Sequence, residues 1–358
     1  MKRIGITCAL ESNGGMDLFS NSLAQTAVFL LRLFKKAGHA AVLLSGHDSP
    51  APDLKLSSFG IEIQDVTNAW PDLDVVIVCN RKLSLTEIAT YKAKGTKIVL
   101  HIGGSLALDT MASLINGAPG FGYEDAKLYD QVWMTVAQAK SCRSWCENVY
   151  GCPVVVVPPV WEPLFIPKSY GFLEGGPQPH PEDDIRGWQI VVNEPPHTVS
   201  RSVHWPLMAI HHAMLAMPKM NRVVGIYVNH AAQLSSNVPF VHFLSKLGFR
   251  PMPPGADLFL MESTVGLQLV GNRADMIVTH DIEDGLDYSW FEALYGGYPL
   301  IHCSEFLGQG YRYHRFDMGG AGLQIRKAIE SHDPKQTKAD FRDMMPQLQN
   351  QQAYEVLL

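Results

Sequence analysis

Residues 272–304 contain acidic residues, histidines and glycines. Their spacing predicts that they lie at one edge of a parallel sheet. A short β-branched run predicts a strand, and the acidic loop after it leads into helical spacing from Tyr288 to Tyr295. A glycine pair predicts the end of this helix, because glycine adopts the left-handed conformation without strain. Glu292 is therefore expected on a helix beyond the carboxyl end of a strand, where open α/β sheets bind ligands.

The segment Glu-Ala-Leu-Tyr-Gly-Gly-Tyr-Pro-Leu-Ile-His at 292–302 resembles the Glu-Ala-…-Gly-x-Pro-Val segment of GT-B glycosyltransferases. It is most similar to an uncharacterised bacterial family of GT-B-like proteins. That family's pattern reads His-x-x-Glu-Asn-Gly-x-x-Tyr-x-x-x-Glu-Ala-Leu-Tyr-Gly-Gly-Tyr-Pro-Leu-Ile-His-Asn-Ser. Asp284 replaces the first Asn of the pattern, and Cys303 replaces the later one. The resemblance spans nearly the whole chain and is densest in 272–304.

The resemblance implies a set of donor-binding residues. In GT-B enzymes the glutamate of this segment typically holds the ribose hydroxyls of a nucleotide-sugar, which implies that role for Glu292. The implied donor is a nucleotide-sugar, with a UDP-sugar favoured. Further donor-binding residues implied by the resemblance are Asn193, Arg201, His280, Gly285 and Tyr288.

The chemistry of transfer has two routes, which the sequence leaves open. A retaining route would use Glu283 or Asp284, which precede Glu292 at a spacing similar to the paired acids of many such enzymes. An inverting route would need a base in the first half of the chain. The candidates for that base are Asp17, Glu11 and His101.

Arg201 follows a predicted strand at 189–192 and precedes a predicted helix at 206–215. The loop resembles the family stretch Glu-Pro-Asn-x-x-x-x-Lys-Thr-Ser-His-x-Pro, with Arg201 in place of the lysine. GT-B enzymes commonly supply a Lys or Arg to the diphosphate here, and arginine pairs phosphate oxygens bidentately. The alternative is a solvated arginine at a helix start, which the helix dipole disfavours. With such a cation and helix N-termini, the chemistry needs no metal and no further cofactor.

The acceptor side is expected in the first half. The stretch from Phe19 to Thr26 is similar to the family pattern aromatic-Ser-Asn-Gly-x-x-Gln-Asn, with the Asn and Gln retained. A glycine pair follows a predicted strand at 97–101, and it is equally well explained as a tight turn into the helix predicted near 106–115. The acceptor-side candidates are Asn21, Gln25, His101, Gly103, Gly104 and Ser105.

Bulk composition excludes several classes of protein. The 358 residues suffice for two domains, and 46% hydrophobic with 18% charged residues indicates a globular chain. A net charge of −6 argues against a surface that binds nucleic acid everywhere. The chain has no apolar run of the roughly 20 residues needed to cross a bilayer and no recognisable signal peptide, so a cytoplasmic location is expected.

Two smaller patterns bear on the binding of metal ions and of nucleobases. Cys142, Cys146 and Cys152 form the only cysteine cluster, without a Cys-x-x-Cys pair, so one helix face is favoured over a zinc site. The run 311–316, Tyr-Arg-Tyr-His-Arg-Phe, interleaves aromatic and basic residues. Such a run can stack nucleobases, although core packing with solvated arginines is commoner.

Strands and helices alternate in both halves, which predicts an α/β fold with two doubly wound domains. The resemblance implies that this fold is of GT-B type, with two Rossmann-like domains facing across a cleft. Prolines and glycines block regular structure between the halves. The predicted divisions are an acceptor-side domain at 1–160, a linker at 161–188 that acts as a hinge, a nucleotide-sugar domain at 189–335, and a C-terminal helix at 336–358 packing back on the first domain.

The resemblance implies a metal-independent hexosyl- or pentosyltransferase that moves a sugar from a nucleotide-sugar to a glycan or other hydroxyl acceptor. One alternative is a non-catalytic nucleotide- or sugar-binding protein on the same fold, because fold does not fix function. Another is a phage-type DNA-base glycosyltransferase acting on a modified cytosine, against which the acidic balance of the chain counts.

Overall fold

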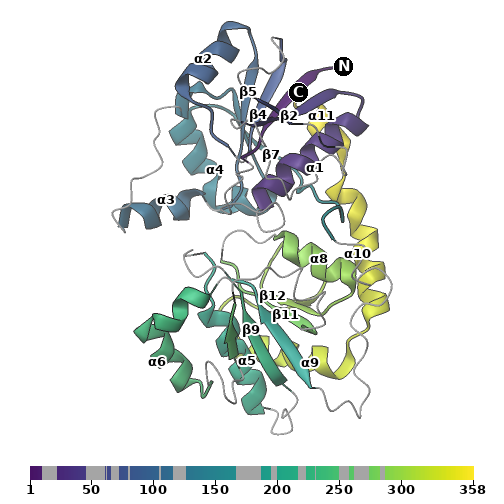
Figure 1. Ribbon diagram of the computed structural model, residues 1–358. Coiled ribbons are helices and arrows are strands. Elements are labelled where there is room, and N and C mark those ends of the chain that lie inside the picture. The colour runs from purple at the N-terminus through teal and green to yellow at the C-terminus, as the bar shows by residue number, and fades with distance from the viewer. Residues whose placement is uncertain are drawn as a thin grey trace. The chain divides into compact units, whose positions relative to one another are not determined.

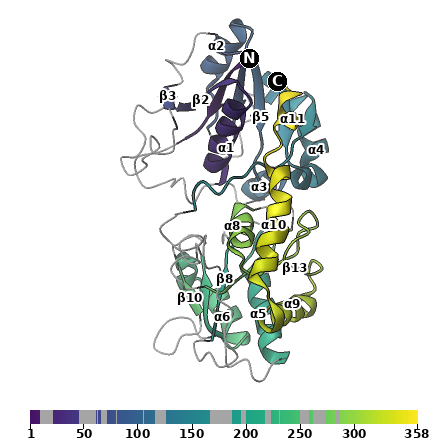
Figure 2. The ribbon, with the colours of Figure 1, turned by 90° about the vertical axis from the view of Figure 1, so that its right-hand side faces the viewer.

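The computed structural model divides into two compact units, Met1–Glu162 with Pro346–Leu358, and Pro163–Met345 (Figures 1 and 2). Each unit is described by itself. The structure describes residues 1–9, 22–45, 61, 63–65, 72–79, 81–104, 106–115, 126–166, 187–194, 200–216, 223–229, 231–249, 258–261, 274–282 and 287–358.

The first unit is built on a parallel sheet whose described strands run in the order β3-β2-β1-β4-β5-β6-β7. The central strands are short, β-branched and buried on both faces, as parallel strands covered by helices must be. The order reverses between β1 and β4, which is the switch point of a doubly wound fold. The strands are β1 (Arg3–Thr7), β2 (Ala40–Ser45), β3 (Ile63–Asp65), β4 (Val75–Val78), β5 (Lys97–His101), β6 (Gln131–Met134) and β7 (Val154–Val156).

The helices of the first unit begin and end where local chemistry directs. A capping box between Ser84 and Glu87 opens α2, because each side chain accepts a hydrogen bond from the other's backbone N–H. Cys142 and Cys146 lie buried on one face of α4, as their spacing predicted. The helices are α1 (Ser22–Lys36), α2 (Leu85–Ala93), α3 (Leu106–Ile115) and α4 (Val136–Tyr150).

The C-terminal residues complete the first unit. Tyr354 on α11 (Gln351–Glu355) is fully buried, and its hydroxyl donates to the carbonyl of Pro158 at 2.6 Å. Its ring lies against the rings of Phe34 and Trp133. The sequence suggested one helix in this region, whereas the structure has α10 (Pro334–Leu348) and α11, because Asn350 caps a new helix through the backbone N–H of Ala353.

The second unit repeats the architecture with the order β10-β9-β8-β11-β12-β13, and every described pairing is parallel. Its switch point lies between β8 and β11, where Val191 pairs with Ile277. The strands are β8 (Trp188–Val192), β9 (Val223–Val228), β10 (Leu258–Leu260), β11 (Met276–Val278), β12 (Leu300–His302) and β13 (Tyr311–Arg312).

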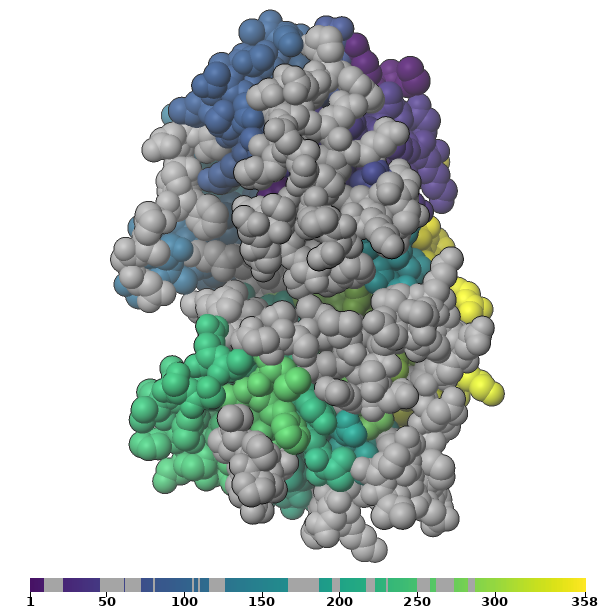
Figure 3. Space-filling model, viewed as in Figure 1, coloured from purple at the N-terminus to yellow at the C-terminus, as the bar shows by residue number. Residues whose placement is uncertain are grey.

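Helices α5 (His204–Ala216) and α9 (Met318–Ser331) pack together over one core of this sheet (Figure 1). Helix α8 (Tyr288–Gly296) begins at the N-cap Asp287 and ends at Gly297, whose φ of 76° suits glycine. Helix α6 (Val238–Lys246) forms part of the unit's outer surface (Figure 3). No helix within the described ranges has the length and apolar character that a membrane crossing requires.

Candidate donor-binding site

Glu194 joins the two strands of the switch point in the second unit. It follows β8, is fully buried, and accepts a hydrogen bond from the backbone N–H of His280 at 2.8 Å, beyond the end of β11. The hydroxyl of Thr279 donates to the same carboxylate oxygen. Burial raises the pKa of Glu194 to about 7, although these donors and Arg201 favour the ionised form. A carboxylate thus occupies the edge at which such sheets bind ligands.

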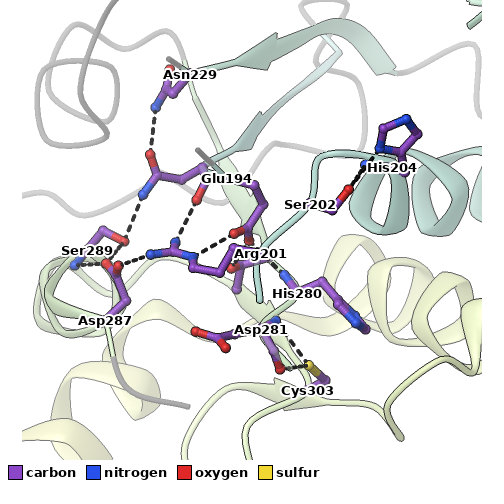
Figure 4. Close-up of polar contacts among 12 residues, drawn as sticks. Glu194, Arg201, Ser202, His204, Asn229, His280, Asp281, Asp287, Ser289 and Cys303 are labelled. Atoms are coloured by element: carbon purple, nitrogen blue, oxygen red, sulfur yellow. Dashed lines mark hydrogen bonds and ion pairs between the residues drawn. The ribbon is translucent and has the colours of Figure 1, made fainter. Parts of the chain in front are cut away.

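Arg201 completes a buried ion network with two carboxylates. Its Nε donates to Glu194 at 2.7 Å, one terminal nitrogen donates to Asp287 at 2.5 Å, and the other donates to the carbonyl of Asn193 at 2.8 Å (Figure 4). Its side chain is 13% exposed, and the adjacent carboxylates raise its pKa well above the ordinary value. These partners engage the guanidinium before any diphosphate arrives. Phosphate binding by Arg201 stays a prediction, and the structure adds a role in fixing the loop after β8 to α8.

Asp287 transmits this network into α8. As the N-cap, it accepts hydrogen bonds from the backbone N–H of Ser289 at 2.8 Å and from the Ser289 hydroxyl. Ser289 in turn accepts from the side-chain amide of Asn193 at 3.1 Å, and that amide oxygen accepts from Asn229 at the end of β9 (Figure 4). Arg201 and the serine lower the pKa of Asp287 despite burial. The network therefore fixes the start of α8 against the strand ends.

Glu292 lies in the second turn of α8, on the helix that the sequence predicted for it. Residues three apart share a helix face, so Glu292 shares the face of Ser289, which contacts the strand ends. Its carboxylate is half-buried and forms no hydrogen bond or ion pair with any residue that the structure describes. Burial and the charge of Asp287 raise its pKa to about 8. A carboxylate held in this way can accept hydrogen bonds from the hydroxyl groups of a ligand.

His280 presents a free acceptor nitrogen. The hydroxyl of Tyr313 donates to the carbonyl of Thr279 at 2.8 Å, so its contact of 2.9 Å with Nδ1 of His280 requires the proton to be on Nδ1. The other nitrogen, Nε2, is buried and has no partner within the described part of the chain. Burial, aided by the charge of Arg315, lowers the pKa of His280 to about 4. The imidazole is therefore neutral at physiological pH, with Nε2 as an acceptor.

In the first unit, the glycine pair after β5 is accounted for by its surroundings. A Cβ added to Gly103 would lie 1.9 Å from Cδ2 of Leu23, so glycine is needed there for packing against α1. Gly104 has a φ of 85°, which suits the turn that leads into α3. Gln25 is buried on α1. His101 is also buried, which lowers its pKa to about 4, and its Nδ1 lacks a partner among the described residues.

The structure brings Asn193, Arg201 and His280 together beside the helix that carries Tyr288 and Glu292. Several sequence-derived candidates lie outside the described residues: Glu11, Asp17, Asn21, Ser105, Glu283, Asp284 and Gly285. Sequence analysis missed other members of the network, which share one signal, a polar side chain just beyond a strand end or at a helix cap. They are Glu194, Asn229, Thr279 and Asp287.

A family model described as protein of unknown function (DUF2827) matches residues 4–356. The chain belongs to the DUF2827 family. A search of curated proteins found no match for this DUF2827 chain. Within the described ranges, no group of three or more His, Cys, Asp or Glu side chains is arranged to hold a metal ion.

Solved structures similar to this DUF2827 chain share its whole length. HepE from Anabaena in complex with UDP-glucose is 12% identical, with a TM-score of 0.62, and covers 100% of this chain and 99% of its own. An alpha-glucosyltransferase in complex with UDP and a 13-mer DNA containing an HMU base is 11% identical, with a TM-score of 0.61 and coverages of 99% and 98%. Alpha,alpha-trehalose 6-phosphate synthase from Burkholderia multivorans is 9% identical, with a TM-score of 0.58 and coverages of 100% and 97%. The predicted GT-B fold is therefore confirmed.

Proposed function

We propose that this protein is a glycosyltransferase that moves a sugar from a nucleotide-sugar, with a UDP-sugar favoured, to a hydroxyl acceptor. The observation that carries the proposal is Glu292, a half-buried carboxylate beside the switch point of the second sheet that has no partner among the described residues. Structural need alone does not explain a carboxylate whose pKa is raised to about 8 by burial. Ribose hydroxyls would satisfy it.

The proposal divides the work between the units. The second unit holds the donor, with Glu292 on the ribose and the network around Arg201 keeping α8 in place for it. Neighbours of the same fold were solved with UDP or UDP-glucose, which supports a uridine donor. The first unit holds the acceptor, and the predicted hinge and linker at 161–188 join the two. The same proposal includes three further points. The transferred sugar is a hexose or a pentose, the reaction needs no metal, and the protein acts in the cytoplasm.

A thermal-shift panel of UDP, GDP, CMP and dTDP with their sugars tests the donor, and a turnover assay then tests transfer or hydrolysis. At pH 9, where Glu292 is mostly ionised, Glu292→Gln should weaken the best nucleotide about tenfold or more, because a hydrogen bond to a charged group contributes about 1.5–3 kcal/mol. Glu330→Gln is the control. Glu330 lies near the end of α9, on a different helix from Glu292. Binding without turnover would favour the non-catalytic alternative. No nucleotide binding would overturn the proposal.

A second candidate is glucosylation of a DNA base. Its support is the full-length similarity to the alpha-glucosyltransferase solved with UDP and DNA. The net charge of −6 counts against it, because phosphate contacts dominate the affinity of proteins for DNA. Transfer of labelled glucose from UDP-glucose to duplex DNA containing hydroxymethylated bases would establish this acceptor, and transfer only to glycans would exclude it.

A further inference from the structure

The turn that leads into α9 holds an aromatic side chain in an unfavourable backbone conformation. Phe316 has a φ of 65°, and it is the only non-glycine residue within the described ranges with a positive φ. It occupies the third position of a turn closed by a hydrogen bond from the Asp317 N–H to the His314 carbonyl, where glycine or asparagine is favoured. The residue is 51% exposed. Neither backbone preference nor burial explains a phenylalanine at this position.

The ring of Phe316 belongs to a group of three rings, which we call the aromatic platform: Trp205, His280 and Phe316. Trp205, at the start of α5, stacks on His280 with centroids 5.4 Å apart. Phe316 lies 5.0 Å from Trp205 and 5.5 Å from His280. Figure 4 shows the imidazole of His280 turned away from Arg201, so the platform is distinct from the ion network.

Arg315 adds a cation beside the platform. Its side chain is half-buried and forms no ion pair or hydrogen bond with any described residue, and its Nε is buried without a partner. It lies close enough to His280 for its charge to add to the lowering of the His280 pKa that burial causes, and its charge partly opposes the rise that burial causes in the pKa of Cys303. Among the described residues, a buried donor on Arg315 and a buried acceptor on His280 are therefore both unsatisfied, which costs free energy unless a ligand or water pairs with them.

The hydrogen-bonding character of these groups selects the ligand. Because His280 is neutral with its proton on Nδ1, Nε2 needs a donor, which an ionised phosphate oxygen does not supply. A sugar hydroxyl both donates and accepts, so it can satisfy His280 and Arg315. The exposed face of Phe316 suits the C–H face of a pyranose ring, as aromatic surfaces with a few placed polar groups suit small ligands.

We propose that the aromatic platform and Arg315 form a carbohydrate subsite that holds the sugar ring of the donor. This inference rests on the proposed function and names the part of the donor that these residues recognise. Phe316 acts as a specificity residue through its ring, and the strained backbone places that ring over the subsite.

Calorimetric titration with UDP and with UDP-glucose separates the sugar from the nucleotide. In Phe316→Asn and Arg315→Gln, the ratio of the UDP-glucose Kd to the UDP Kd should rise about tenfold, as expected for one lost polar or stacking contact, while the UDP Kd stays unchanged. Both positions are at least partly exposed, so the variants should fold. Leu323→Asn, at a 58% exposed position on α9, is the matched control and should leave the ratio unchanged.

Thermal unfolding of Phe316→Asn provides a second readout. Asparagine tolerates a positive φ, so the variant should melt at the same or a higher temperature while losing sugar recognition. A lower melting temperature with an unchanged ratio would show that the ring serves packing only and would overturn the inference. Equal weakening of UDP and UDP-glucose would also overturn it, by assigning the cluster to the nucleotide. If the unmodified protein binds neither ligand, the proposed function fails first, and this inference fails with it.

Discussion

The two units share the order of their first six strands, and the first sheet adds β7. In each unit, a side chain at or just beyond the end of the first strand accepts a hydrogen bond from a backbone N–H beyond the end of the fourth strand. In the first unit this side chain is Thr7, which accepts from the Cys79 N–H at 3.0 Å and donates to the Arg81 carbonyl at 2.6 Å. In the second unit it is Glu194, which accepts from the His280 N–H at 2.8 Å. The same backbone requirement is met once by a neutral hydroxyl and once by a buried charge.

The difference shows which unit has charged groups that its fold does not require for stability. A threonine satisfies the backbone of the first switch point without an ionised group, and the nearby Cys79 thiol has its pKa raised by burial. Glu194 requires Arg201 as a partner, and Arg201 requires Asp287, although apolar side chains often replace buried ion networks without loss of stability. What the network adds is a fixed position for α8, which carries Glu292, a carboxylate with no partner in the described part of the chain. We therefore assign donor binding to the second unit.

The largest expected effect comes from removing the centre of that network. Arg201→Met should lower the free energy of unfolding of the second unit by about 3–5 kcal/mol near pH 8, because Glu194 and Asp287 lose their buried counter-charge. The loss should shrink near pH 5, where Glu194 can take up a proton. Urea unfolding followed by tryptophan fluorescence measures both values.

Arg32→Met in the first unit is the matched control. Arg32 pairs with Glu162 at 2.9 Å, but their side chains are 39% and 20% exposed, so the loss should stay below about 1 kcal/mol. Equal losses in the two variants would remove the contrast between the units.

A smaller effect is expected at Gly103 in the first unit. Gly103→Ala should destabilise by about 1–3 kcal/mol, because its new methyl group would overlap Leu23. Adding Leu23→Ala should remove the overlap and recover part of the loss relative to Leu23→Ala alone. Gly308→Ala, where an added Cβ meets nothing within 4 Å, is the control. Unchanged stability together with weaker acceptor binding would return Gly103 to the role that the sequence suggested.

The smallest expected effect is a pH dependence of nucleotide affinity. A pKa of about 8 leaves Glu292 mostly protonated at pH 7, whereas the ionised carboxylate is the better acceptor for ribose hydroxyls. UDP affinity should therefore rise up to about tenfold from pH 7 to pH 9, as the ionised fraction rises. Glu292→Gln should flatten this profile. Affinity that falls over this range in the unmodified protein would contradict the role of Glu292.

The raised pKa of Glu292 also makes the free energy of unfolding depend on pH. Its folded pKa lies above the ordinary value of 4.5, so the associated stability is fully present below pH 4.5 and is lost as pH rises through about 8. Glu292→Gln should therefore raise the melting temperature at pH 9 relative to the unmodified protein, and the difference should be small at pH 5.

Sequence analysis predicted the alternation of strands and helices, because buried β-branched runs and capped helices are local signals. The GT-B type of the fold was predicted from the resemblance of the 292–302 segment. Sequence analysis did not predict β3, β10 or β13, because these short strands lack a run of β-branched residues like those in β7 and β11. Helix α10 begins earlier than expected because proline is favoured in the first turn, with Asp333 capping the N–H of Lys335.

The site was harder to predict than the fold, because its contacts join residues far apart in the chain. Arg201 was found through its place before a helix, but its pairing with Glu194 and Asp287 depends on two strand ends and a helix cap meeting. The run 311–316 was weighed as a core segment. Tyr313 is indeed buried, while Arg315 and Phe316 point to a subsite only once the unpartnered nitrogen of His280 is seen beside them.

Amide hydrogen exchange with and without saturating UDP shows which unit binds the nucleotide. Added protection is expected in peptides that cover 188–194, 276–282 and 287–296, where the strand ends and α8 meet the nucleotide, with no added protection in 97–104. In Glu292→Gln, the protection of 287–296 should fall at the same UDP concentration. Protection confined to the first unit would contradict the assignment of the donor to the second.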